Sequence, residues 1–189
     1  MATEPRFVIV GTGRSGTGYI SKLLTASGVR CGHEEWWNPQ GTRADGLVGD
    51  ASWLATTELA GYGGFVFHQT RHPLDVVTSM VNVELHEPYL GWQQRLTGSL
   101  ADPVERSAVA YVMWNLAAER RAEFRWQVEQ VTGDVLHEVG RRVGRAVRPA
   151  LGQVRTTVNQ HHDRPRIGWG RLGPMEHPVR QFAARYGYE

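Results

Sequence analysis

The chain lacks several features that mark particular classes of protein. Cys31 is the only cysteine among its 189 residues, so no disulfide forms within the chain, as expected in a reducing compartment. No apolar run approaches membrane-spanning length, and the polar start, residues 1–5, does not resemble a signal peptide. We therefore expect a cytoplasmic protein with no membrane span.

Lysine is almost absent as well. Lys22 is the only one, and every other basic residue except histidine is arginine. A GC-rich genome accounts for that total, although the planar guanidinium also suits bidentate recognition of anions. The formal net charge of +2 is too small to indicate nucleic-acid binding, and the basic set Arg141, Arg145 and Arg148 has the spacing of a solvated helix face.

A hydrophobic content of 41% and a charged content of 21% are typical of a soluble globular chain. There is no internal repeat, low-complexity tract or linker. We therefore expect residues 1–189 to form a single domain with a substantial core.

Glycines are concentrated in residues 11–17, Gly-Thr-Gly-Arg-Ser-Gly-Thr, directly after the apolar run 7–10. A strand, a glycine-rich turn and a helix start in this order present backbone N–H groups to an anion. Gly11 and Gly16 have the spacing of a nucleoside-triphosphate loop. However, Thr17 replaces the lysine of that loop, and Gly18 replaces the hydroxyl that binds magnesium. The sequence thus predicts an anion cradle without the groups that handle Mg-ATP.

The remaining pattern alternates strands with helices. Strands are predicted at 6–10, 65–70 and 124–131, and residues 154–158 are β-prone. Helices are predicted over a segment closed by Gly28, from Pro73, over 103–123 with a buried stripe of Val109, Val112, Met113 and Leu116, over 134–148, and over 178–186. Residues 32–64 are predicted to be irregular apart from a short helix near 53–59, and 159–174 to be a loop. This order predicts an α/β fold, a parallel sheet with helices on both faces.

A second cluster of polar residues follows the strand at 65–70. Arg71 is placed at its carboxyl end, where open α/β sheets bind ligands. Ser79 lies eight residues later in the helix that Pro73 opens. The two side chains are positioned to bracket one anionic group, although Arg71 paired with a carboxylate and Ser79 facing solvent would fit the same sequence.

Together the two clusters resemble sulfotransferases that use 3′-phosphoadenosine 5′-phosphosulfate (PAPS). That family has a first-strand loop of the type [PG]-x-[KR]-S-G-T and a second motif, R-x-P-x-x-x-x-x-S, both of which this chain contains. The resemblance implies a P-loop NTPase-like three-layer sandwich and metal-independent sulfuryl transfer. It also implies that the loop holds the 5′-phosphosulfate and that Arg71 and Ser79 hold the 3′-phosphate. The implied loop contacts are Gly11, Thr12, Gly13, Arg14, Ser15, Gly16 and Thr17.

Weaker similarities extend over most of the chain. Residues 32–34, Gly-His-Glu, and the Asp-x-Ser-Trp at 50–53 resemble elements of bacterial members, which also commonly have arginine at the position of Arg14. The segment 158–169 resembles the C-terminal nucleotide loop, with Arg164, Arg166 and Gly168 as implied phosphate contacts. The chain is shorter than most members, which leaves little sequence to cover an acceptor.

Transfer to an alcohol needs a base near the acceptor oxygen. His33 and Glu34 are the candidates, together with Arg14 as the cation beside the transferred group; His68 is a competitor that is expected to pack or to orient a neighbour. Trp36, Trp37, Trp53 and Trp92 are candidates for stacking or for core. The predicted partner is a small-molecule, lipid or carbohydrate acceptor, with no nucleic acid; acceptor identity and oligomeric state stay open. The alternatives are a nucleotide kinase or NTPase, and a non-catalytic nucleotide-binding protein.

Overall fold

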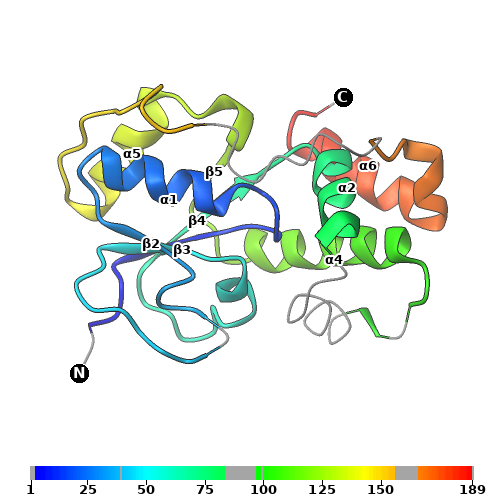
Figure 1. Cartoon of the computed structure of the whole chain (residues 1–189), viewed down its shortest axis with the longest axis horizontal. Coiled ribbons are helices and arrows are strands. Elements are labelled where there is room, and N and C mark those ends of the chain that lie inside the picture. The colour runs from blue at the N-terminus through cyan, green and yellow to red at the C-terminus, as the bar shows by residue number, and fades with distance from the viewer. Residues whose placement is uncertain (1–2, 39, 84–96, 99, 156–165, 189) are drawn as a thin grey trace.

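The computed structural model describes residues 3–38, 40–83, 97–98, 100–155 and 166–188. Its centre is a sheet of five parallel strands in the order β2-β3-β1-β4-β5 (Figure 1). The strands are β1 Phe7–Val10, β2 Cys31–His33, β3 Gly49–Ala51, β4 Phe65–Thr70 and β5 Phe124–Gln127. The predicted α/β class and parallel sheet are confirmed.

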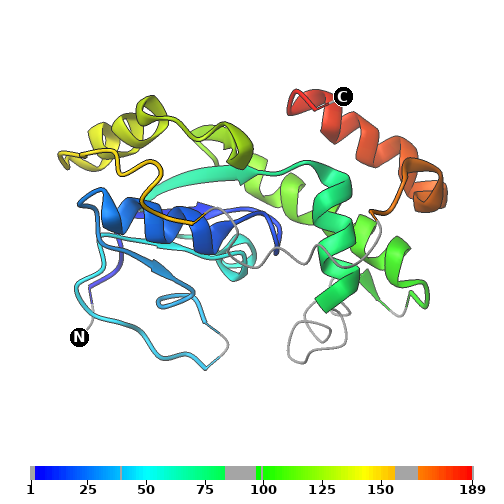
Figure 2. The same ribbon diagram turned by 45° about the horizontal axis from the view of Figure 1, so that its top comes forward.

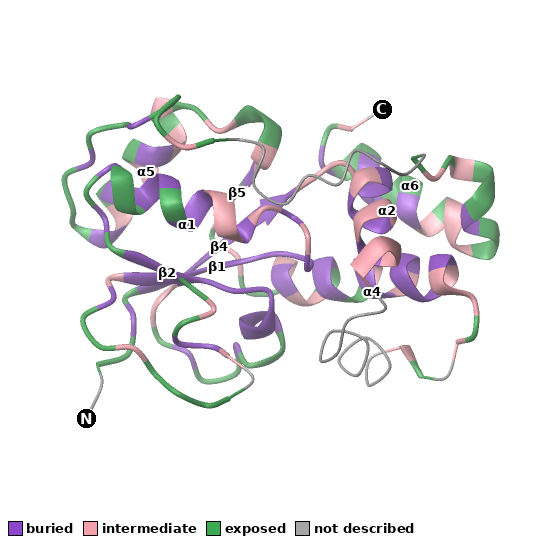
Figure 3. Cartoon of the chain, in the orientation of Figure 1, coloured by how far each residue is buried: buried purple, intermediate pink, exposed green. Residues whose placement is uncertain are grey.

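Helices cover both faces of the sheet (Figure 1 and Figure 2). One face is covered by α1 Thr17–Ala26 and α5 Gly133–Val143, and the other by α2 Pro73–Val83, α4 Pro103–Glu119 and α6 Glu176–Arg185. Alternate side chains of β1 enter the two cores: Phe7 and Ile9 pack with α1 and α5, whereas Val8 and Val10 join the opposite core. All four are fully buried, as Figure 3 shows for the strand as a whole.

Residues 32–64 are largely irregular, as predicted, but the prediction missed two short strands. These strands of three residues each, β2 and β3, lie in or next to that segment, and β3 pairs directly with β1. The sequence of β3, Gly-Asp-Ala, has no large apolar residue and so did not indicate a strand. Glycine is required at position 49, because a Cβ there would lie 2.0 Å from the Phe7 ring. The short helix expected near 53–59 is present as the 3₁₀ helix η1, Leu54–Thr57.

The stripe predicted for α4 is also wrong. Met113 is 45% exposed and Leu116 is 37% exposed. The buried side of α4 instead carries Tyr111, Trp114 and Asn115, with small residues between them. The helix therefore packs through aromatic, polar and small side chains, which a search for aliphatic spacing does not detect.

Other boundaries shift. The strand predicted at 124–131 ends at Gln127 and continues as the 3₁₀ helix η2, Val128–Gln130. The helix predicted at 134–148 ends at Val143, where Gly144 adopts a φ of 67°. The segment 159–174, expected to be a loop, contains the start of η3, Trp169–Met175, within its described part. Of the β-prone segment, 154–155 is not strand and 156–158 lies outside the described residues.

The strand order sets the position of the ligand crevice. The chain leaves β1 toward β2 and β3, but it leaves β4 toward β5 on the other side. Connections that diverge from neighbouring parallel strands open a crevice at the strands' carboxyl ends. Loop 11–16 follows β1 and Arg71 follows β4, so both lie at this crevice. Within the described residues, every helix is too short or too polar to cross a membrane.

Candidate functional site

Loop 11–16 is a tight turn that ends directly before the first residue of α1, Thr17. The Ser15 N–H donates to the Thr12 carbonyl at 3.0 Å, and Arg14 and Gly16 have φ values of 73° and 92°. Gly16 is the N-cap of α1 and supplies no side-chain cap. Because the first turn, Thr17–Ile20, also has no acidic side chain, the positive end of α1 is not neutralised locally. This end of the helix is suited to bind an anion.

Close packing against β4 holds the loop in place. A Cβ on Gly11 would lie 2.4 Å from the Gln69 carbonyl oxygen, so only glycine fits there. The buried Gln69 side chain donates from Nε2 to the Ser15 carbonyl at 2.9 Å and accepts from Trp126 Nε1 at 3.0 Å. Sequence reasoning missed Gln69. The signal was an amide within the buried strand β4, two residues before Arg71.

The two predicted anion grips are in direct contact. Arg14 Nε donates to Ser79 Oγ at 2.9 Å, and Arg71 Nη1 donates to the Arg14 carbonyl at 3.1 Å. The Arg71 guanidinium therefore points toward loop 11–16, and Ser79 reaches the loop from α2. Two guanidinium groups and one hydroxyl therefore meet at the β1–β4 crevice, although Arg14 and Ser79 are 65 residues apart in sequence.

The other loop residues are mostly buried. Thr12, Gly13, Ser15 and Thr17 are all in the buried class. Ser15 Oγ is directed toward Gly11, since a Cβ there would lie 2.6 Å from it, and it has no hydrogen-bond partner among the described residues. The Ser15 hydroxyl thus lies beneath the loop.

His33 and Glu34 follow β2 and reach the start of α1. His33 Nε2 lies 3.2 Å from Thr17 Oγ1 and 3.3 Å from Glu34 Oε1. A carboxylate only accepts hydrogen bonds, so this arrangement assigns the imidazole proton to Nε2. The His33 side chain is 41% exposed, and its partial desolvation, followed by the positive charges of Lys22 and Arg14, lowers its pKa and favours the neutral form.

Glu34 has the opposite shift. Burial raises the pKa of its carboxyl, while a hydrogen bond from the Trp53 side chain and the charge of Arg14 act against the rise. Glu34 also has a φ of 58°, unusual for a residue with a side chain. Together, a carboxyl group with raised proton affinity and a neutral imidazole lie close enough to Arg14 to feel its charge.

Asp50 fixes the turn that follows Glu34. Its fully buried carboxylate accepts from the backbone N–H groups of Glu35, Trp36 and Trp37, at 3.2, 3.1 and 3.2 Å. Burial raises the pKa of Asp50, although these three donors oppose the rise. Asp50 is the first residue of the Asp-x-Ser-Trp element at 50–53, but the sequence did not indicate that it binds this turn.

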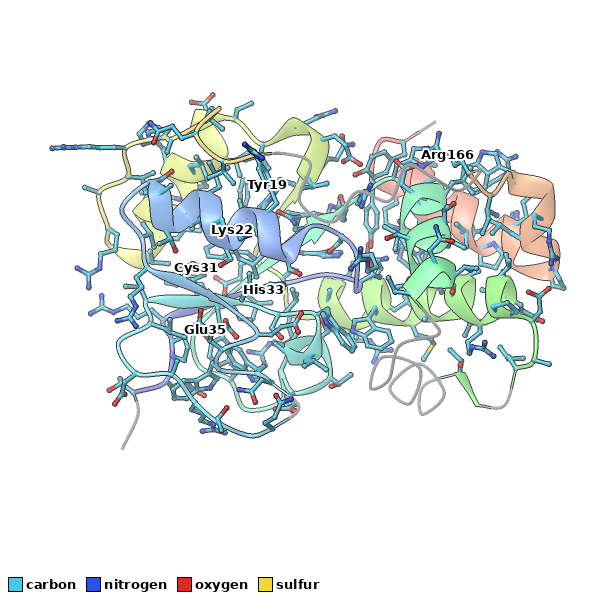
Figure 4. The ribbon with its side chains drawn as sticks, in the orientation of Figure 1. Tyr19, Lys22, Cys31, His33, Glu35 and Arg166 are labelled. Atoms are coloured by element: carbon cyan, nitrogen blue, oxygen red, sulfur yellow. The ribbon has the colours of Figure 1, made fainter. Side chains whose placement is uncertain are left out.

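The C-terminal candidates lie on the α2 side of the crevice. Arg166 pairs with Asp75 at 2.8 Å and lies 2.7 Å from His72 Nδ1. Figure 4 shows Arg166 beside α2 and α6, away from His33 near α1. Gly168 is exposed and precedes η3, and Arg164 lies outside the described residues.

His68 and three of the four candidate tryptophans belong to the buried core. His68 is fully buried, and its Nε2 lies 2.9 Å from Asn115 Oδ1 of α4. Trp36, Trp37 and Trp53 are buried within the core on the α4 face, with Trp53 carbonyl accepting from Trp114 Nε1. Trp92 lies outside the described residues.

A pocket of about 350 Å³ lies next to Glu34. Its lining is polar apart from one alanine and consists of Glu34, Glu35, Asn38, Gln40, Thr42, Arg43 and Ala44. Glu34 therefore contacts both the His33–Thr17 pair and an open polar surface. No family model matches this chain, and no curated protein matches it either.

Proposed function

We propose that this chain is a sulfotransferase that uses PAPS as its donor substrate and transfers the sulfuryl group to a hydroxyl or amine without a metal ion. The observation that carries the proposal is the contact of Arg14 with both Ser79 and Arg71. It joins the loop motif and the Arg71 motif into one cationic site. PAPS carries a 5′-phosphosulfate and a 3′-phosphate on the same ribose, and these two anionic groups match a site with two adjoining anion grips.

The donor side uses the groups of the β1–β4 crevice. The uncapped start of α1 and the Arg14 guanidinium would hold the 5′-phosphosulfate. Arg71 and Ser79 would hold the 3′-phosphate; Ser79 Oγ accepts from Arg14, which leaves its O–H to donate. The same loop after β1 supports assigning the fold to the P-loop NTPase-like sandwiches.

The acceptor side uses Glu34. The acceptor oxygen would form a bond to sulfur while the bond from sulfur to the 5′-phosphate oxygen breaks, and its electron pair would leave with adenosine 3′,5′-bisphosphate. The acceptor proton would pass to the Glu34 carboxylate. His33 Nε2–H would orient that carboxylate, because it lies 3.3 Å from Oε1. The polar pocket beside Glu34 favours a hydrophilic acceptor over a lipid.

Ligand preference tests this proposal directly. We expect adenosine 3′,5′-bisphosphate to bind more tightly than AMP, with and without EDTA, in isothermal titration and thermal shift. Replacing Arg71 with alanine should remove about 10–100-fold in affinity for the bisphosphate, the value of one or two charge-assisted hydrogen bonds, and leave AMP binding nearly unchanged. Arg145→Ala is the matched control, because Arg145 is exposed and follows α5.

Each alternative gives a different result. Tighter binding of Mg-ATP than of the bisphosphate would indicate a kinase or NTPase, which Thr17 and Gly18 oppose. Tight bisphosphate binding without sulfation of any sugar, amine, phenol or alcohol would indicate a binding protein.

A further inference from the structure

The turn that carries Arg71 is fastened from outside its own strand and helix. The His72 N–H donates to Glu129 Oε1 at 2.9 Å, across 57 residues of sequence. The Leu74 N–H donates to His72 Nδ1 at 3.2 Å, which links this fastening to the first turn of α2. Glu129 lies in η2, directly after β5. The position of the turn is therefore set by the neighbouring strand.

The C-terminal segment completes this connection. Tyr188 OH donates to the second carboxylate oxygen of Glu129 at 2.8 Å, and its ring lies 5.4 Å from the His72 ring. The Tyr188 N–H donates to the Ala183 carbonyl at 2.8 Å, which holds the residue against the end of α6. Figure 1 shows this end of the chain close to the start of α2. Burial raises the pKa of the Tyr188 hydroxyl, so it stays protonated and able to donate.

The Glu129 carboxylate thus bridges two segments that no local sequence pattern connects. One oxygen holds the backbone immediately after Arg71, and the other holds Tyr188. The His72 side chain is held as well, because Arg166 contacts its Nδ1. His72 is thus held through its backbone N–H and through its ring, which leaves the preceding residue, Arg71, little freedom. Arg71 Nη1 is aimed at the Arg14 carbonyl.

We propose that Glu129 and Tyr188 are positioning residues for the 3′-phosphate grip, acting through the His72 backbone to aim the Arg71 guanidinium. This inference rests on the proposed function, because the ligand that reports it is adenosine 3′,5′-bisphosphate. A guanidinium displaced by a fraction of an ångström loses the short, aligned geometry of a charge-assisted hydrogen bond. The two residues therefore affect discrimination between ligands with and without a 3′-phosphate.

The experiment compares two variants with a matched control. Glu129→Gln removes the charge but keeps the size of the side chain, and Tyr188→Phe removes only the hydroxyl. Glu119→Gln is the control, because Glu119 is also a carboxylate that tethers α6, through Arg185 Nη1 at 2.6 Å, and it also pairs with Arg125 of β5. Isothermal titration with adenosine 3′,5′-bisphosphate and with AMP gives the affinity ratio for each protein, and circular dichroism confirms folding.

We expect the ratio to fall by about tenfold in Glu129→Gln and in Tyr188→Phe, and to stay at the wild-type value in Glu119→Gln. In an Arg71→Ala background, Glu129→Gln should have no further effect on the ratio. Should Glu129→Gln fail to fold, Tyr188→Phe alone decides the matter.

Other results overturn the inference in distinguishable ways. A wild-type ratio near one removes both the proposed function and this role. A clear wild-type preference that both variants retain removes this role alone. An equal loss in Glu119→Gln shows that only the docking of α6 matters, and it also removes the role.

Discussion

Arg14 and Glu34 are the two non-glycine residues with a left-handed backbone among the described residues. Such a conformation costs about 1–2 kcal/mol for a residue with a side chain, so it persists only where the surroundings impose it. The left-handed conformation of Arg14 is imposed by the tight loop and by the contacts of Arg14 with Ser79 and Arg71. That of Glu34 is imposed by the strand before it and by the turn after it, which Asp50 binds. Both side chains are thereby directed by strained backbone, a common property of functional positions.

Substitutions of Arg14 separate its chemical role from its structural cost. We expect Arg14→Ala to lower turnover by about 10²–10³, as for loss of one preorganised charge-stabilising donor. Arg14→Gly should lower turnover equally. Its free energy of unfolding should be about 1 kcal/mol higher than that of Arg14→Ala, because glycine adopts a φ of 73° without strain.

The measurements are release of adenosine 3′,5′-bisphosphate from PAPS with the best acceptor from a screen, and urea unfolding. Arg145→Ala serves as the control. Turnover close to wild type in Arg14→Ala would exclude Arg14 from the mechanism.

Among the elements, β1 was predictable as a run of buried apolar residues, and β4 because its apolar and aromatic first half, residues 65–67, lies in a β-type run that ends before the turn at Arg71. Because they are neighbours in a parallel sheet, the motifs that follow them had to meet at one edge. β2 and β3 could not be predicted, since three-residue strands containing glycine show no period. Asp50, Gln69 and Glu129 stabilise the site through partners 13–15, 54–57 and 57–59 residues away, and no local spacing encodes those contacts.

The segment from β2 to η1 depends on Asp50 as well as on apolar packing. We expect Asp50→Ala to lower the free energy of unfolding by about 3 kcal/mol or more, because three backbone N–H groups lose their acceptor in a buried place. Asp50→Asn should be milder, since the amide oxygen still accepts. Urea unfolding followed by tryptophan fluorescence measures both, with Asp45→Ala as the control, because Asp45 is exposed in the loop before β3. Equal stability of Asp50→Ala and wild type would show that the turn does not need the carboxylate.

Over the whole molecule, β4 is the strand from which two adjacent, fully buried polar side chains enter the two opposite cores. Gln69 enters the α1–α5 side and contacts the loop, whereas His68 points to the side covered by α4 and α6. These two residues are adjacent in sequence, so one strand supplies the support of the anion loop on one face and a buried hydrogen bond on the other.

His68 makes the stability of the protein dependent on pH. Burial, reinforced by the positive charge of Arg125 on β5, lowers its pKa to about 4, although the bond to Asn115 on α4 opposes the shift. The ring of Tyr186, the residue directly after α6, packs against His68. The unfolded chain binds this proton with a pKa near 6.5, so it takes up the proton before the folded chain does. The contribution of His68 to the free energy of unfolding should thus be fully present above pH 6.5, fall as the pH drops toward 4, and level off below that, with a total loss of about 3 kcal/mol.

Urea unfolding at pH 7 and pH 5 measures the loss of stability. The difference between the two pH values should be smaller in His68→Gln, because glutamine does not titrate. Glu34 and Asp50, whose pKa values are raised, contribute with the opposite sign in both proteins. The comparison between the two proteins therefore isolates His68, and an identical pH dependence in His68→Gln would show that this histidine does not control acid stability.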